Sequence, residues 1–147
     1  ANQPPVIGKD DGILTASEVQ DLDLTGVEQA VLSACETGLG QSAGGEGLLG
    51  LQRGFQLAGC RTVVASLWKV PDGATKELMT RYYDNLWDGK MPKGQALRKA
   101  QLAILRGEVP PSSLRGPQLE PTPQPTAKPH GTPPIYWAAW VLSGGWK

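Results

Sequence analysis

The chain has 147 residues, enough for one domain, and its 14 basic and 14 acidic side chains leave no net charge. This balance argues against a nucleic-acid-binding stripe or an anionic membrane surface as partner, and no apolar run reaches the roughly 18 residues of a membrane span. The two cysteines, Cys35 and Cys60, stand in dissimilar contexts and predict no disulfide framework. Free thiols are easiest to keep in a reducing compartment, so we expect a cytoplasmic protein.

The first predicted elements are a short helix, a strand and a longer helix. Thr15 and Glu18 have the spacing of a capping box, which predicts a helix over residues 16–20. The apolar run at residues 28–32 predicts a buried strand. A glycine-rich loop follows at residues 38–47, and apolar residues then recur at helical spacing as far as Gly59, which is placed as a C-cap.

The second half of the chain predicts another strand, two helices and a last strand. Residues 61–68 form a strand rich in β-branched and aromatic residues, which a right-handed crossover places parallel to the first. Asp72 is expected to cap a helix that ends near Gly89, and a third long helix begins near Pro92 and ends at Gly107. The expected inner stripes are Thr75, Met79, Tyr82 and Leu86 on the first helix, and Leu97, Ala100 and Ile104 on the second.

A change of composition marks residues 108–134, which contain nine of the thirteen prolines and almost no large apolar side chains. This insert predicts an extended or disordered loop. Residues 135–142 resume an apolar and aromatic pattern and predict the last strand. Three strands make a thin sheet, so we expect more sheet upstream and interpret the chain, which starts at Ala1, as a piece of something longer.

Cys35 is the residue most suited to chemistry. It follows a predicted strand and precedes the glycine-rich loop, where backbone N–H groups and the start of a helix favour thiolate over thiol. A small buried hydrophobe is the alternative interpretation. Cys60 opens a strand after Ala58 and Gly59 and is interpreted as packing. The one histidine, His130, lies in the proline-rich insert and is interpreted as a loop residue.

Four separated motifs stand in the chain in order: residues 31–38 (VLSACETG), 45–51 (GEGLLGL), 63–72 (VVASLWKVPD) and 136–139 (YWAA). This set closely resembles the CHAT domain, a caspase-like domain found beside tetratricopeptide repeats in bacterial proteins. The resemblance covers the C-terminal part of such a domain. It implies an α/β fold, an incomplete caspase-like three-layer sandwich with a mostly parallel sheet, helices on both faces and the N-terminal strands missing.

The resemblance implies a cysteine endopeptidase that acts on a protein or peptide substrate. Cys35 is then the nucleophile, and its backbone N–H is half of the oxyanion hole. The strand after the cysteine helix borders the substrate groove in such folds, which makes Ser66, Leu67 and Trp68 candidate substrate contacts. The chemistry of this family needs no metal or organic cofactor.

Two acidic residues have two interpretations each. Glu36 either contributes to substrate choice or orients the loop by accepting backbone N–H bonds. Asp72 either orders the loop beside the substrate contacts or is a plain helix N-cap. The sequence does not separate these alternatives.

The chain departs from the family pattern, which places the catalytic histidine upstream of the cysteine, because residues 1–34 contain no histidine. We therefore expect the chain to be inactive alone and to need an upstream, histidine-bearing half, with a tetratricopeptide repeat region as a further partner. A non-catalytic scaffold is the main alternative. A dinucleotide-binding module, suggested by Gly38, Gly40 and Gly44 and by Lys69, is a remote one because no acidic residue ends the second strand.

Overall fold

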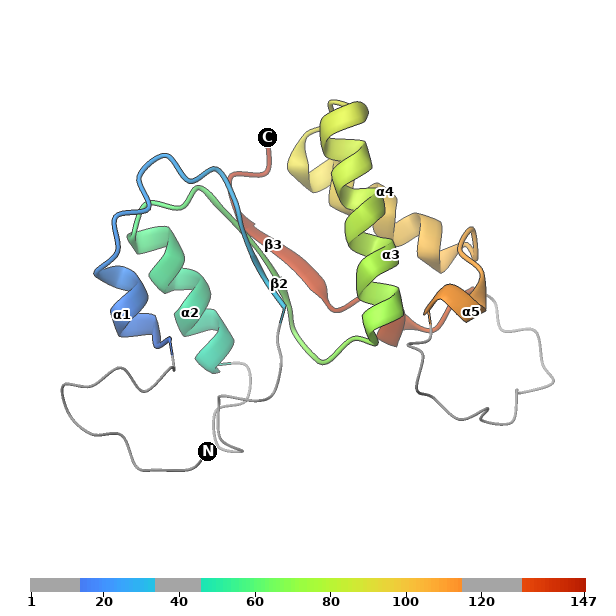
Figure 1. Ribbon diagram of the computed structural model, residues 1–147, viewed down its shortest axis with the longest axis horizontal. Coiled ribbons are helices and arrows are strands. Elements are labelled where there is room, and N and C mark those ends of the chain that lie inside the picture. The colour runs from blue at the N-terminus through green and yellow to red at the C-terminus, as the bar shows by residue number, and fades with distance from the viewer. Residues whose placement is uncertain (1–13, 34–45, 115–130) are drawn as a thin grey trace.

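The computed structural model describes residues 14–33, 46–114 and 131–147 of the chain. A sheet runs through its middle in the strand order β1 (Ala30–Leu32), β2 (Thr62–Ser66), β3 (Trp140–Gly144) (Figure 1). β1 and β2 are parallel, as predicted, whereas β3 runs antiparallel to β2. The described part of the sheet is therefore mixed, with one parallel and one antiparallel pair, where a mostly parallel sheet was predicted.

The last strand lies further along the chain than predicted. Residues 134–136 form a 3₁₀ turn, η2 (Pro134–Tyr136), and the N–H of Ala138 donates to the carbonyl of Pro134 at 2.8 Å. Pro133 and Pro134 have no N–H for a ladder, and the turn uses the backbone groups that follow them locally. The predicted strand at residues 135–142 is therefore wrong in its first half, and pairing with β2 begins at Trp140.

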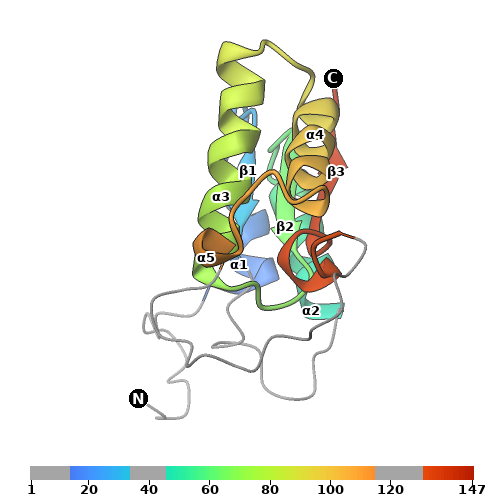
Figure 2. The ribbon, with the colours of Figure 1, turned by 90° about the vertical axis from the view of Figure 1, so that its right-hand side faces the viewer.

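Helices cover both faces of the sheet, as predicted (Figures 1 and 2). α1 (Ala16–Gln20) and α2 (Glu46–Leu57) lie on one face, and α3 (Asp72–Tyr83) and α4 (Lys93–Leu105) lie on the other. All five residues of β2 are buried, which is the pattern of a central strand covered on both sides. The larger core packs between the sheet and α3 and α4, and its largest members include Val64, Leu78, Tyr82, Ile104 and Trp140.

The predicted ends of α1, α2 and α4 are confirmed. The N–H of Glu18 donates to Thr15 Oγ1 at 3.3 Å, and the Glu18 carboxylate accepts from the Thr15 N–H at 2.7 Å, which completes the capping box. Gly59 follows α2 with φ of 109°, and Gly107 follows α4 with φ of 73°. The predicted stripe of α4 is buried throughout, at Leu97, Ala100 and Ile104.

The predicted cap of α3 is wrong. Pro71 occupies the N-cap position with φ of −55° and ψ of 140°, and Asp72 is the first helical residue. No side chain makes a capping hydrogen bond here, because the residue in the capping position is a proline. Asp72 still lies in the first turn, where the helix dipole favours a negative charge.

The predicted stripe of α3 is right only in part. Tyr82 is buried, and Met79 and Leu86 are half-buried against the core. The other fully buried positions are Ala74 and Leu78, which the stripe did not include. Successive residues of a helix point about 100° apart, so shifting the predicted stripe by one position changes which side of the helix packs against the sheet. The helix continues as a π-helical turn, η1 (Asp84–Asp88), as far as Gly89, which confirms its predicted end.

The proline-rich insert is partly structured, which corrects the expectation of a loop over residues 108–134. Pro111–Leu114 form a short helix, α5, and Val109 and Leu114 are buried in the core beside α3. Burial of these two apolar side chains in the core fixes this part of the segment. Residues 115–130, with His130, lie outside the described residues. None of the described helices is long and apolar enough to cross a membrane.

Candidate active site

The candidate site begins where β1 and β2 end. Leu32 lies beside Ala65 in the parallel register, and Ser33 and Ser66 each come one residue later, at the same edge of the sheet. Ser33 is exposed. Parallel α/β sheets bind ligands outside the carboxyl ends of their strands, so this is the edge at which the sequence places the nucleophile. Cys35 and Glu36 themselves lie outside the described residues, and their roles stay predictions.

Polar contacts anchor the other end of β1. The Glu28 carboxylate forms ion pairs with Arg61 at 3.1 Å and with Lys93 at 3.3 Å. Lys93 Nζ also donates a hydrogen bond to Thr62 Oγ1 at 3.2 Å. The hydroxyl of Tyr82 donates to Gln29. These contacts join α3, α4 and the start of β2 to the residues just before β1, so the strand that leads to Ser33 is held in register from its amino end.

The three residues predicted to contact substrate differ in exposure. Ser66 is the last residue of β2, paired with Trp140 and only 1% exposed. Leu67 and Trp68 follow it in the loop toward α3 and are 48% and 39% exposed. The N–H of Leu67 donates to the carbonyl of Ala139 at 2.9 Å, which fixes the start of this loop. A molecule at this edge therefore meets the side chains of Leu67 and Trp68 rather than that of Ser66.

Trp68 lies against a residue that the sequence analysis did not select. Its indole Nε1 donates to the carbonyl of Ile135 at 3.5 Å, and the Ile135 side chain is 51% exposed. Leu67, Trp68 and Ile135 are three exposed apolar residues near the carboxyl ends of β1 and β2, and we call this group the rim surface. The pair Pro133-Pro134 was the available sequence signal, because two prolines predict a turn that displays the next residue.

Asp72 is exposed at the start of α3, four residues after Trp68. Since its carboxylate makes no capping hydrogen bond, the N-cap interpretation is excluded. Its role in ordering the loop stays a prediction.

Cys60 is buried, 3% exposed, and its thiol donates to the carbonyl of Thr62 at 3.2 Å. This confirms its interpretation as a packing residue, and Cys35 is the chain's other cysteine. Across residues 14–33, 46–114 and 131–147, no group of three or more histidine, cysteine, aspartate or glutamate side chains is placed to hold a metal ion.

A mixed sheet flanked by helices on both faces defines an α/β domain. In α/β domains the carboxyl ends of parallel strands are where ligands bind. The family model of the CHAT domain matches residues 2–145, and the chain belongs to this family. It is 34% identical over 92 residues to tetratricopeptide repeat protein 28 of Mus musculus and 33% identical over 92 residues to that of Homo sapiens. Each match covers 60% of this chain and 4% of the relative. No solved structure is significantly similar to it.

These relatives accord with the expected association between CHAT domains and tetratricopeptide repeats. Both are mammalian, whereas the resemblance suggested a bacterial setting. The chain spans a small fraction of their length, and their names mention repeats and no proteolysis.

Proposed function

We propose that this chain carries the nucleophile of a caspase-like cysteine endopeptidase and that a separate, upstream segment completes its active site. The observation that carries the proposal is the shared edge of β1 and β2: exposed Ser33 and the rim surface lie at the carboxyl ends of two parallel strands. Cys35 stands two residues after Ser33, and two residues span at most about 7 Å. We infer from this short separation that the thiol acts at the same edge as the rim surface.

The chemistry follows from a thiolate at this place. The Cys35 sulfur attacks the carbonyl carbon of the scissile peptide, and the N–H of Cys35 and a glycine N–H of the other segment bind the oxyanion. The C–N bond then breaks, the amine leaves with a proton from the histidine, and water hydrolyses the thioester. The chain's single histidine comes after the cysteine, at position 130, so the base in this scheme comes from the upstream segment.

The sheet has room for that segment. Among the described residues β1 pairs with β2 only, and its three residues are half-buried where all five of β2 are buried. An unpaired strand edge presents free N–H and C=O groups to a further strand. We infer that a strand of the upstream segment pairs with β1 and that this pairing completes the three-layer, caspase-like sandwich.

The rim surface supports a peptide substrate. Leu67, Trp68 and Ile135 present apolar side chains next to the loop backbone, a combination that suits an extended peptide. Replacing Trp68 by alanine is expected to lower kcat/KM about tenfold, because a half-exposed indole contributes on the order of 1–2 kcal/mol to a contact of this kind. Trp87, 67% exposed on η1, provides the matched control, and its replacement by alanine is expected to leave kcat/KM unchanged.

The decisive experiment co-expresses the chain with the segment encoded upstream of it and measures cleavage of a peptide library. Cys35→Ala is expected to reduce cleavage by a factor on the order of 1,000 or more. Cys60→Ala is expected to retain cleavage, because this thiol is buried. Iodoacetamide labelling followed by mass spectrometry is expected to modify Cys35 before Cys60. Equal cleavage by the Cys35→Ala variant and the parent would refute the assignment.

A non-catalytic scaffold is the second candidate, and the absence of histidine from residues 1–34 favours it. The same co-expression separates the two functions. A complex that forms through β1 but cleaves no member of the library, with Cys35 no more reactive than Cys60, identifies a scaffold.

A further inference from the structure

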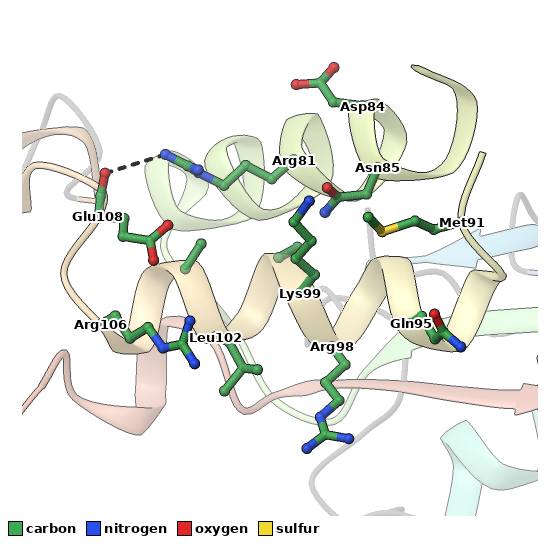
Figure 3. A pocket seen from close by; sticks show the side chains of 12 residues that line it. Arg81, Asp84, Asn85, Met91, Gln95, Arg98, Lys99, Leu102, Arg106 and Glu108 are labelled. Carbon is green, nitrogen blue, oxygen red and sulfur yellow. Dashed lines mark hydrogen bonds between the residues drawn. The ribbon is translucent and has the colours of Figure 1, made fainter. Parts of the chain in front are cut away.

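A groove of about 650 Å³ lies between α3 and α4, on the side of these helices turned away from the sheet (Figure 3). Arg81 and Asn85 of α3 and η1 line one wall, and Lys99 and Leu102 of α4 lie on the other. Figure 3 shows Arg81 reaching toward Glu108 and Lys99 rising toward Asn85. The groove is distinct from the rim surface, since none of the rim residues lines it.

Positive charge is concentrated at this groove although the whole chain is neutral. Residues 95–106, which supply most of its lining, contain three basic side chains and no carboxylate. The groove is lined by four of the chain's basic residues, Arg81, Arg98, Lys99 and Arg106, against two acidic ones, Asp84 and Glu108. The ion pairs found in the described part of the chain both involve Glu28, so none of these four cations has a carboxylate partner there.

An ordinary solvated helix face intersperses acidic and basic residues three and four positions apart. The outer face of α4 does not: Gln95, Arg98, Lys99 and Leu102 follow one another at helical spacing, and no residue of α4 is acidic. The basic residues of this face extend from Arg98 to Arg106, about 12 Å at 1.5 Å per residue, and with Arg81 they outnumber the two carboxylates that line the groove. Such a stripe attracts a chain of opposite charge.

Arg81 adds a second observation at the same place. Its Nε is buried and has no hydrogen-bond partner, and its Nη2 donates to the carbonyl of Glu108 at the long distance of 3.4 Å. A guanidinium has five donors in a fork that matches a carboxylate, and a buried donor without a partner is costly. A carboxylate in the groove would pair with the donors that the fold leaves unused.

We propose that the groove between α3 and α4 binds an acidic segment of another polypeptide. The length of the stripe corresponds to about four residues of extended chain at 3.3 Å each. Met91 and Leu102 add apolar contacts that suit a peptide with interspersed apolar residues. The described lining contains no aromatic side chain on which a base would stack, which disfavours single-stranded nucleic acid. The proposal does not depend on peptidase activity.

The test measures binding of the full chain to a fluorescein-labelled peptide of alternating glutamate and alanine by fluorescence anisotropy at about 0.15 M salt, where the Debye length is about 8 Å. A glutamine-alanine peptide of the same length and a single-stranded oligonucleotide serve as comparison ligands. Arg98→Glu combined with Lys99→Glu is expected to weaken peptide binding about tenfold or more, because two attractive contacts become repulsive. The control is Arg53→Glu combined with Lys76→Glu, two exposed cations outside the groove, and it is expected to change binding less than about twofold.

A neutral double variant, Arg98→Gln with Lys99→Gln, separates loss of attraction from loss of folding. It is expected to weaken binding while its circular dichroism matches the parent. Absence of binding to the glutamate-alanine peptide overturns the proposal, and so does an equal effect of the Arg53 and Lys76 control. Tighter binding of the oligonucleotide than of the acidic peptide also overturns it and assigns the groove to nucleic acid.

Discussion

Replacing Gly59 by alanine is expected to destabilise the domain far more than the same change at Gly107, although both glycines end helices with positive φ. At Gly59 φ is 109°, and a Cβ would lie 2.9 Å from the backbone nitrogen of Thr25 and 3.2 Å from the carbonyl carbon of Leu24. At Gly107 φ is 73°, close to the left-handed helical region, and no atom lies within 4 Å of the built Cβ. Alanine at Gly59 therefore meets both steric overlap and a less favourable φ, whereas alanine at Gly107 meets only the mild strain of a left-handed φ.

The magnitudes follow from these contacts. A strained backbone costs about 1–3 kcal/mol, and overpacking against atoms that cannot move away costs about as much again. Alanine has less conformational freedom than glycine in the unfolded chain, which offsets about 0.4–1 kcal/mol of this loss of stability. The segment that meets Gly59 is held by the hydrogen bond from the Leu24 N–H to the Ala58 carbonyl at 2.8 Å, so it does not relax freely. We expect a loss of about 2–4 kcal/mol for Gly59→Ala and about 1 kcal/mol or less for Gly107→Ala.

The measurement is urea unfolding of the full chain followed by tryptophan fluorescence, with the free energy of unfolding extrapolated to water. A difference of about 2 kcal/mol between the two variants supports the close approach of Thr25 to Gly59. Losses that agree within about 0.5 kcal/mol would show that the steric contact is absent and refute the reasoning.

Three further predictions concern the core and its charges. Burial, with a smaller contribution from Tyr83, raises the pKa of Tyr82 from 10.0 to about 12. Between these pH values the native state keeps a proton that the unfolded state loses, so the free energy of unfolding falls as pH rises. Urea unfolding of Tyr82→Phe should therefore show a smaller loss of stability at alkaline pH than the parent. Leu78→Ala is expected to cost about 3 kcal/mol and Met79→Ala clearly less, since Leu78 is fully buried and Met79 half-buried; equal thermal shifts would contradict the assigned face of α3. Glu28→Gln is expected to cost less than about 1 kcal/mol, and a loss that persists in high salt would argue against ion pairing as its cause.

The sheet edge that the candidate site occupies was predictable from local sequence. A cysteine after an apolar run and before glycines indicates a strand end, and the parallel pairing of β1 and β2 confirms the edge on which that inference depends. The exposure of individual side chains was not predictable. Ser66 and Leu67 are neighbours in the same motif, yet one is buried and the other half-exposed, because β2 ends between them. Ile135 comes to Trp68 only through folding, from a position 67 residues away.

The sequence by itself determined the order and type of most helices and strands, since caps, glycines, prolines and apolar spacing act within a few residues. Thr15 and Glu18 specify the start of α1 without help from the rest of the chain. Only the tertiary structure decided which face of α3 is buried. It also decided that the side chains of Val109 and Leu114, in the proline-rich segment, pack into the core. Neighbouring positions on a helix have similar local patterns, and burial depends on the shape of the surface that the rest of the chain presents to them.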